Sequence, residues 1–350
     1  MLQPDFHGGM GRATIEDVAR QAGVSVATVD RVLNGRAAVR PQTVQLVEGA
    51  IRRLNYQPDR LAARLARGKE YRFCFVLPEG NNSYMIGLGD EVRGAASRMT
   101  QDKVNIDLRL TDVFDAEVLA RTLDQIGDIY DGVAVVALDH PRVKEAINGL
   151  SERGVTVVTL VSDVPGSKRA HYVGIDNSGA GRTAATLMGR YLGDRRGKVG
   201  LIAGSLSLRD HIERQFGFEQ VMMHEYPQLT VLPVREGRDD WQMVRAVAVQ
   251  LLAEHPDMIG LYNVGAGTRG ILEALEQSGR KKDVVYIAHE LTEHSRPALV
   301  DGAIDAIINQ DAGHEVRSAI RILMAKADKT PIFEAMERIR IDIFVRDNLP

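Results

Sequence analysis

The chain has 350 residues, a hydrophobic content of 44% and a formal net charge of −3. This length leaves room for a small domain together with one or two α/β domains. A single cysteine, Cys74, excludes an intramolecular disulfide and indicates a reducing compartment. No apolar run approaches the ~20 residues of a membrane-spanning helix. Residues 1–11 lack the apolar region of a signal peptide, so we expect a disordered extension there and a cytoplasmic protein.

Residues 12–57 predict a small domain that begins with a well-capped helix. Thr14 is a preferred N-cap residue, and Asp17 stands three residues later, in a weak version of the capping box. Apolar residues at helical spacing follow as far as Ala22. Gly23 then suits the left-handed turn that ends a helix.

Two more helices are predicted in this domain. Ser25 caps a second helix, Val26–Leu33, and a third helix spans Pro41–Leu54, with proline at a tolerated first-turn position. Two short helices joined by a tight glycine-containing turn form a helix-turn-helix, whose second helix enters the major groove of DNA. The pattern therefore predicts a DNA-binding head.

Side chains and charge on this head agree with that prediction. Arg31 can bond bidentately to guanine, while Val26, Ala27 and the Thr28 methyl group offer apolar contact to thymine. Residues 12–69 hold eleven Lys and Arg against five Asp and Glu, a net of +6, so the rest of the chain carries −9. The alternative is an ordinary helical subdomain whose arginines are simply solvated. That alternative does not explain why the glycine turn, the helix caps and the positive charge occur together.

The stretch TIEDVARQAGVSVATVDRVLNG, followed by LNYQPDRLAARL, resembles the heads of the lactose-repressor family of bacterial regulators. The resemblance implies a homodimer that binds a pseudo-palindromic operator in double-stranded DNA, one head per half-site. It also implies a hinge helix over residues 58–69 that folds only on operator DNA, with Leu65 wedged between central base pairs. The DNA-contacting residues expected on these grounds are Thr14, Ser25, Val26, Ala27, Thr28, Asp30, Arg31, Asn34, Arg40, Arg60, Ala62 and Leu65.

Asp30 departs from the family pattern, which has serine at this position. Phosphates repel a carboxylate, although a carboxylate can accept a hydrogen bond from cytosine N4. Our hypothesis is that Asp30 shifts the operator preference.

From Tyr71 onward, short apolar runs alternate with helical patterns, which predicts doubly wound parallel sheets. The expected strands are Arg72–Leu77, Asn105–Leu110, Gly132–Ala137, Thr156–Val161, His171–Gly174, Lys198–Ala203, Thr230–Pro233, Ile259–Tyr262, Val284–Ala288 and Ala306–Ile308. The expected helices include Glu91–Met99, Ala116–Ile126, Arg142–Arg153, Gly179–Leu192 and Trp241–Glu254. Ten strands need two sheets, which indicates two lobes within residues 70–350.

The resemblance implies the same body, similar to periplasmic sugar-binding proteins of type I, with a ligand cleft between two lobes that three segments cross. We place the crossings near Asp176, Ala303 and Thr330. The first lobe then holds residues 70–176 and 304–330, and the second lobe holds 177–303 and 331–350. A final strand, Arg338–Val345, returns to the edge of the second lobe or to the hinge.

Ligands of open α/β sheets bind beyond the carboxyl ends of the strands. Polar residues at those ends are the candidate effector contacts, although each one alone is more often a cap or turn residue than a ligand contact. They are Asn82, Ser83, Tyr84, Asp112, Asp139, His140, Asp163, Arg214, Asn263, Glu290 and Gln310. Arg214 and Glu290 stand where sugar-binding relatives keep ligand residues.

The chemistry of this set favours a polyhydroxylated effector. Carboxylates, amides and an arginine can exchange paired hydrogen bonds with vicinal hydroxyls, and Tyr84, Phe114 or Trp241 can supply a stacking face. A phosphorylated or acidic effector is disfavoured, because Arg209 and Arg214 are the obvious cations near the strand ends. A sugar, a polyol or a similar catabolite is expected, and a purine is the other option within the family.

Two alternatives come from other classes of protein. Gly265, Gly267 and Gly270 follow a strand as G-x-G-x-x-G, and Glu290 lies twenty residues beyond, which approximates the fingerprint of an NAD-dependent oxidoreductase. A transport-type solute-binding protein shares the architecture of the body. The DNA-binding head weighs against both, and His289 and His294 stand five residues apart, which does not suit a shared metal on one helix face.

The sequence therefore predicts a non-enzymatic transcription regulator with no cofactor and no metal site. We expect a repressor of a carbohydrate or polyol catabolism operon, which binds DNA as a homodimer and responds to a small molecule in the cleft. Whether the effector releases the operator or strengthens binding stays open, as does dimer against tetramer.

Overall fold

The computed structural model describes residues 13–33, 39–54, 56 and 69–350. The chain divides after Lys69 into two units. The predicted extension over residues 1–11 and the contact residues Asn34, Arg60, Ala62 and Leu65 lie outside the described residues, as does the predicted hinge helix apart from Lys69.

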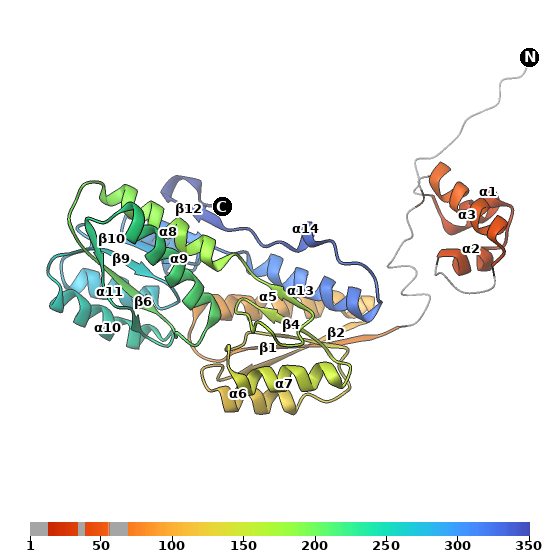
Figure 1. The fold of residues 1–350 in the computed structure, drawn as a ribbon, viewed down its shortest axis with the longest axis horizontal. Helices are drawn as coiled ribbons and strands as arrows, with labels where there is room; N and C mark the ends of the chain where they lie inside the picture. The colour runs from red at the N-terminus through yellow and green to blue at the C-terminus, as the bar shows by residue number, and fades with distance from the viewer. Residues whose placement is uncertain (1–12, 34–38, 55, 57–68) are drawn as a thin grey trace, which may run out of the picture. The chain divides into compact units, whose positions relative to one another are not determined.

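The N-terminal unit contains three helices in its described part. They are α1 (Ile15–Ala22), α2 (Val26–Leu33) and α3 (Pro41–Arg53), drawn in red and orange in Figure 1. Thr14 and Asp17 form a complete capping box, and Gly23 ends α1 with a φ of 67°. Val18, Val29, Val47 and Ala50 are fully buried between the helices. The predicted helices are thus present, with α3 ending one residue earlier than expected.

The body begins with a parallel sheet in the order β2-β1-β3-β4-β5. Its strands are β1 (Tyr71–Pro78), β2 (Val104–Thr111), β3 (Gly132–Val135), β4 (Thr156–Leu160) and β5 (His171–Val173). Figure 1 shows α5 (Ser83–Met99) and α13 (Ala312–Ala327) on one side of this sheet, with α6 (Ala116–Asp124) and α7 (Pro141–Glu152) on the other. Helices on both faces explain why Phe73 to Leu77 are all fully buried. This sheet and its helices are the first lobe, and a 3₁₀ turn, η1 (Thr100–Asp102), precedes β2.

The second lobe has the strand order β12-β11-β10-β9-β6-β7, and β8 also pairs with β6. Its strands are β6 (Gly197–Ala203), β7 (Leu229–Val231), β8 (Arg235–Glu236), β9 (Met258–Asn263), β10 (Val285–His289), β11 (Ala306–Asn309) and β12 (Asp342–Phe344). One face packs against α8 (Asn177–Leu192) and α9 (Arg209–Glu225). The other face packs against α10 (Trp241–Glu254), α11 (Thr268–Gln277) and α12 (Ser295–Val300). A short α14 (Glu334–Glu337) and a 3₁₀ turn, η2 (Arg346–Asn348), lie near the C-terminus.

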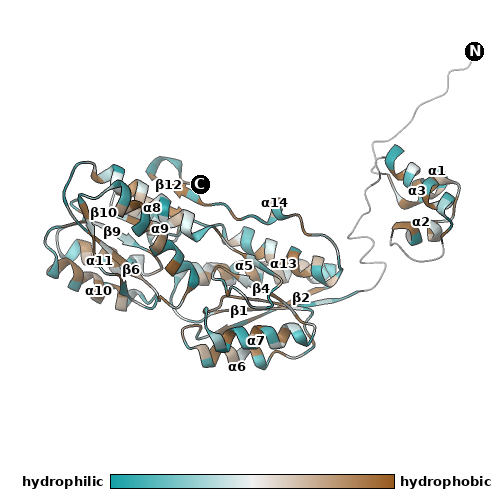
Figure 2. Cartoon of the chain, in the orientation of Figure 1, coloured by the Kyte–Doolittle hydropathy of each residue, from teal (hydrophilic) through white to brown (hydrophobic). Residues whose placement is uncertain are grey.

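The two doubly wound lobes confirm the predicted fold class. Figure 2 shows hydrophobic and hydrophilic residues alternating along helices such as α6 and α7, as expected for helices that turn one side to the core. None of the helices in the described ranges combines the length and the apolar character that crossing a membrane requires.

The chain passes between the lobes at three points, and one of them differs from the predicted lobe boundary. The segment after β5 crosses near Asp176, as expected, but the prediction of a crossing near Ala303 is wrong because β11 pairs with β10 and β12 in the second sheet. Gly302, with a φ of 75°, and Ala303 instead form the turn from α12 into β11, and the chain crosses after Asn309. The third crossing follows α13, and β12 then forms the antiparallel edge of the second sheet.

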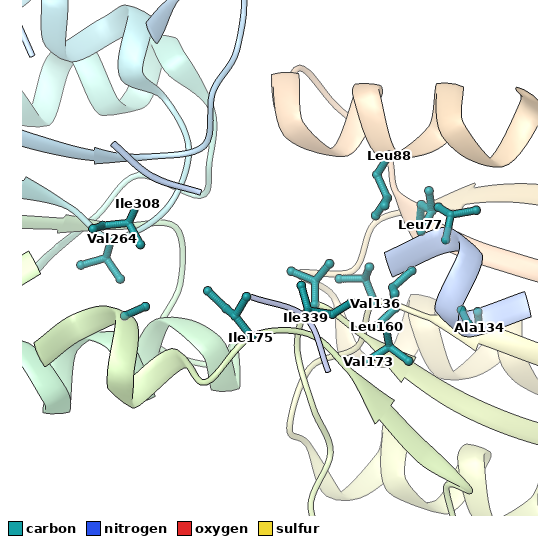
Figure 3. Close-up of a cluster of buried hydrophobic side chains, with 14 of the residues drawn as sticks. Leu77, Leu88, Ala134, Val136, Leu160, Val173, Ile175, Val264, Ile308 and Ile339 are labelled. Carbon is teal, nitrogen blue, oxygen red and sulfur yellow. The ribbon is translucent and has the colours of Figure 1, made fainter. Parts of the chain in front are cut away.

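Apolar side chains on the crossings connect the two lobes. Ile175 is 2% exposed and Ile339 is 4% exposed. Both belong to the same apolar cluster as strand residues of the two sheets. Figure 3 shows them between Val264 and Ile308 of the second lobe and Leu77 and Leu160 of the first. The crossing segments therefore connect the two lobes, and the carboxyl ends of the strands of one sheet face those of the other.

Candidate functional site

The N-terminal unit presents part of α2 to solvent. Val26 is 40% exposed, and Ala27 and Arg31 are also exposed, as is Arg40 just before α3. These residues form the surface that the helix-turn-helix prediction assigned to DNA bases. Asp30 lies in α2, but its side chain lies outside the described part of the structure.

Three other predicted DNA contacts have a structural task in the head. The Thr14 hydroxyl accepts a hydrogen bond from Asp17 N at 3.3 Å. The Ser25 hydroxyl accepts one from Thr28 N at 3.2 Å and lies 2.9 Å from the Thr28 hydroxyl. Thr14 and Ser25 thus cap the starts of α1 and α2.

In the body, a cavity of about 270 Å³ lies between the two lobes. Residues from the carboxyl ends of strands in both sheets line it, as expected for an open α/β fold. The predicted contacts that line this cavity are Asn82, Tyr84, Asp112, Arg214, Glu290 and Gln310. The cleft therefore gathers predicted residues from points far apart in the sequence.

Five predicted contacts do not line the cavity, and four of them also lie away from a smaller pocket beside it. Asp139 and His140 are exposed, and His140 caps α7 by accepting a hydrogen bond from Arg142 N. Asp163 pairs with Arg169 and accepts hydrogen bonds from the Thr159 hydroxyl and Val164 N. Asn263 is fully buried, and its Nδ2 donates to Ala266 O at 3.1 Å. These side chains shape loops and caps rather than the cavity wall.

Ser83, the remaining predicted contact, lies beside the cavity. Its hydroxyl donates to Glu293 Oε1 across the cleft at 2.9 Å, and it lines a smaller neighbouring pocket. Trp241, which the sequence offered as a stacking face, lines that smaller pocket too, where Arg269 stacks over its ring at 3.8 Å. Tyr84 and Phe114 are the predicted aromatic residues that line the main cavity.

The cavity also has polar residues that sequence reasoning missed: Glu79, Asn81, Ser162, Asp210, His211, Arg238, Asp239, Asp240 and His289. A local signal was present for Asp210, because it stands four residues before Arg214 on α9 and the two side chains share a helix face. The loop around Arg238 gave no such signal, because β8 before it is only two residues long.

Arg214 forms part of the cavity floor and is only 3% exposed. Its Nε donates to Asn177 Oδ1 at 2.8 Å and its Nη1 to Val264 O at 3.0 Å. Nη2 lies 3.9 Å from Asp210 Oδ2 and has no hydrogen-bond partner among the described residues. The guanidinium is thus held on two sides and retains one donor group for a ligand.

Glu290 faces Arg214 from the end of β10. Gln310 donates to it twice, from Nε2 at 2.8 Å and from the backbone N at 3.3 Å. Burial raises the pKa of the Glu290 carboxyl to about 7, and the nearby Arg214 opposes part of that rise. Glu290 is therefore partly protonated near neutral pH and can both donate and accept hydrogen bonds.

Beside Glu290 lies a second buried carboxyl, Glu315. The Tyr84 hydroxyl donates to Glu315 Oε2 at 2.7 Å. Burial raises the pKa of Glu315 well above its usual range, while burial and the nearby Arg214 lower the pKa of His289 well below its own. Both shifts favour the neutral form of the side chain.

Several buried polar atoms of cavity-lining residues lack a hydrogen-bond partner among the described residues. They are Asp210 Oδ1, Arg214 Nη2, His289 Nδ1 and Gln310 Oε1. Buried polar atoms in folded proteins are nearly always paired, so four unpaired atoms on residues of one cavity lining are unusual. Donors and acceptors are both among them.

The three glycines of the dinucleotide-type pattern have packing explanations. A Cβ on Gly265 would lie 2.5 Å from Asp239 Oδ1, and one on Gly270 would lie 2.1 Å from Trp241 O. Gly267 has a φ of 92° and starts α11. The glycines are thus required for close contact between α10, α11 and the Asp239 loop, without reference to a dinucleotide.

Comparison with protein families assigns both units. Residues 14–59 match the model of bacterial regulatory proteins of the lacI family. Residues 73–331, well over half of the chain, match the periplasmic binding protein domain.

Individual relatives agree with these matches. The chain is 26% identical to the HTH-type transcriptional regulator CelR of Thermobifida fusca, over 89% of this chain and 91% of that one. It is 32% identical to catabolite control protein A of Streptococcus mutans, but that match spans only 55% of each chain. A solute-binding protein of Burkholderia graminis, solved in complex with D-arabinose, superposes with a TM-score of 0.73 at 22% identity, over 80% of this chain and 96% of that one. This last likeness shows the fold alone.

Proposed function

Because the chain belongs to the lacI family of bacterial regulatory proteins, we propose that it is an effector-responsive repressor that binds operator DNA as a homodimer. The family consists of DNA-binding transcription regulators and not of enzymes, so the oxidoreductase alternative falls away. A bacterial regulator acts on DNA in the cytoplasm. The exposed face of α2 and the net charge of +6 over residues 12–69 support contact with the major groove and the phosphates.

The proposed effector is an uncharged, polyhydroxylated molecule such as a sugar or polyol. The observation that carries this choice is the mixture of amide, carboxylate, imidazole and guanidinium side chains that line the cavity, since a hydroxyl can both donate to and accept from such groups. Phe114 and Tyr84 add apolar ring surface at the cavity wall. The cavity volume of about 270 Å³ lies close to the lower end of the range of about 300–1,000 Å³ that is typical of small-molecule sites, which suits a ligand of monosaccharide size.

An anionic effector fits this cavity poorly. Its lining contains the carboxylates of Glu79, Asp112, Asp210, Asp239, Asp240 and Glu290 against the guanidiniums of Arg214 and Arg238. Asp210 stands in the first turn of α9 and Asp240 caps α10, so side-chain carboxylates already occupy the helix N-termini where a phosphate would otherwise bind. A sugar phosphate or sugar acid would therefore meet repulsion.

Effector binding controls the DNA-binding head through the arrangement of the lobes. A ligand shifts an equilibrium between two arrangements only by its difference in affinity for them. In the proposed mechanism, one arrangement brings the two hinge segments of the dimer together and seats Leu65 in the operator, and the other separates them.

A thermal-shift screen of the full chain tests the effector class. The panel contains neutral sugars, polyols, sugar phosphates, sugar acids, purines and NAD. A ligand at a hundredfold excess over its Kd stabilises the body by about 2.7 kcal/mol. Arg214→Lys should abolish the shift from a neutral sugar or polyol, whereas Arg190→Lys, on the exposed side of α8, should preserve it. A shift produced only by phosphorylated or acidic compounds would contradict the proposed class.

A further inference from the structure

Left-handed backbone conformations of residues other than glycine gather at the cleft. Val161, Arg238, Asp239 and Glu290 have φ values of 64°, 50°, 57° and 68°, and all four line the cavity. Side chains with a Cβ rarely adopt this conformation, and for a β-branched valine it is an outlier. Such strain persists only where surrounding contacts impose it, and it is characteristic of ligand clamps and switch regions.

Two of these residues are consecutive, and the second lobe holds their loop firmly. Arg238 N donates to Gly204 O at 2.8 Å, and Asp239 Oδ1 accepts from Ala266 N at 2.9 Å. Gly204 and Gly265 leave room for the Asp239 carboxylate, because a Cβ on either would lie 2.2 or 2.5 Å from its Oδ1. The second lobe is therefore shaped to present this carboxylate in one position.

The same loop reaches across the cleft with three successive side chains. The Arg238 guanidinium lies 3.8 Å from Asp112 Oδ2 and 5.3 Å from the centre of the Phe114 ring. Asp239 Oδ2 accepts a hydrogen bond from Asn82 Nδ2 at 3.3 Å, and Asp240 Oδ2 accepts one from Asn81 Nδ2 at 2.8 Å. Asn81 and Asn82 precede α5, whose N-cap is Asn82, so the contact is made to a fixed point of the first lobe.

We propose that Arg238–Asp239–Asp240 is a clamp that closes the cleft over the effector and sets the balance between open and closed lobes. This proposal rests on the proposed function and specifies the regulation of the same site. In the closed arrangement, the contacts to the first lobe offset the strain of the loop. When the lobes part, those contacts are lost, so a ligand that adds contacts across the cleft favours closure.

The clamp is accompanied by other contacts between the lobes. The Ser83 hydroxyl donates to Glu293 Oε1 at 2.9 Å, and at another part of the cleft Arg209 N donates to the Ser162 hydroxyl at 3.1 Å and Asp139 N donates to Ser207 O at 3.3 Å. Loss of a clamp contact should therefore shift the ratio of closed to open molecules rather than open every molecule.

An exchange of the hydrogen-bonding groups tests the clamp. Asparagine tolerates the left-handed backbone, and in Asp239→Asn its Oδ1 still accepts the hydrogen bond from Ala266 N. Its Nδ2, however, then faces Asn82 Nδ2, and two donors cannot form a hydrogen bond with each other. The double variant Asn82→Asp with Asp239→Asn restores one donor and one acceptor, and aspartate caps α5 as well as asparagine does. Asp90→Asn is the matched control, because Asp90 is exposed and pairs with Arg93 within α5.

The readout is the separation of the lobes in the full chain. Spin labels at Gln125→Cys after α6 and Ala246→Cys in α10, both exposed positions, report it by double electron–electron resonance. Cys74 is buried and its thiol has a pKa raised to about 11 by burial, so it resists labelling. This distance is measured without DNA or sugar, so an error in the proposed effector class would leave it unchanged.

Asp239→Asn should lower the ratio of closed to open molecules roughly tenfold, the scale of one lost hydrogen bond to a charged group. The double variant should recover most of that change, and the Asp90→Asn control should match the wild type. The clamp is refuted if Asp239→Asn leaves the distance distribution unchanged. Failure of the double variant to restore closure refutes it as well, because the single variant would then act by distorting the loop.

Discussion

Glu290→Gln should make the body less sensitive to pH. Burial raises the pKa of this carboxyl from 4.5 to about 7. Between these values the folded protein holds a proton that the unfolded chain has released, so raising the pH through this window favours unfolding. The rise in this pKa corresponds to about 3 kcal/mol of folding stability, which is fully present below pH 4.5 and is lost as the pH passes 7.

Glutamine resembles the protonated acid and can keep the hydrogen bond with Gln310, but it cannot ionise. The variant and the wild type should therefore have similar unfolding free energies near pH 4.5, and the variant should be more stable by about 3 kcal/mol at pH 8. Urea unfolding followed by the fluorescence of Trp241, the one tryptophan of the chain and part of the body, measures this difference across the pH range. A difference that stays constant from pH 4.5 to pH 8 would refute the buried, protonated state of Glu290.

Three further changes probe the head, the hinge and the helix packing. Arg31→Ala should cost about 1–3 kcal/mol of operator affinity and relax one base position, whereas a uniform loss over all DNA sequences would indicate a phosphate contact instead. Leu65→Ala, at a position outside the described residues, should weaken binding to operator DNA far more than binding to random DNA in titrations with both. Equal losses of affinity would show that Leu65 does not wedge between the central base pairs. Gly270→Ala should lower stability by about 1–3 kcal/mol, since its Cβ would meet Trp241 O, while Gly87→Ala in α5 meets open space and should raise it by up to ~1 kcal/mol. Thermal melts that rank the last two variants in the opposite order would contradict the packing of α10 on α11.

The head could be predicted almost residue by residue because its signals are local. Capping residues, the Gly23 turn and the proline at Pro41 each act within a few residues of the chain, so α1 and α2 begin and end where the sequence indicates. The strands of the body were also readable, since buried parallel strands form continuous apolar runs.

Helices with polar residues on their buried side were harder to predict. On α9, Asp210, His211 and Arg214 face the cavity floor, and on α13, Glu315 and Ser318 are fully buried. These residues interrupt the apolar stripe by which an amphipathic helix is recognised. Function and periodicity conflict at these positions, so apolar spacing alone defines these two helices less clearly.

The sequence identified candidate residues near the ends of strands, but it could not indicate which of them line the cleft. Asp112 and Glu290, which directly follow β2 and β10, line the cavity, but Asn263, the last residue of β9, and Asp139, after β3, do not. Which strand end faces the partner lobe depends on how the lobes pack, and that packing depends on residues far apart in the chain. The Arg238–Asp240 loop and the sheet that holds β11 could not be predicted for the same reason.

The most direct test of the central claim is the affinity of the full chain for its operator with and without an effector. The operator is first selected from random duplexes, and binding is then measured by fluorescence anisotropy at fixed salt. The account predicts a pseudo-palindromic site bound at least about 10³-fold more tightly than random DNA, with an affinity that a neutral sugar or polyol changes and a sugar phosphate does not. Equal affinity for selected and random DNA, or a response confined to anionic compounds, would contradict it.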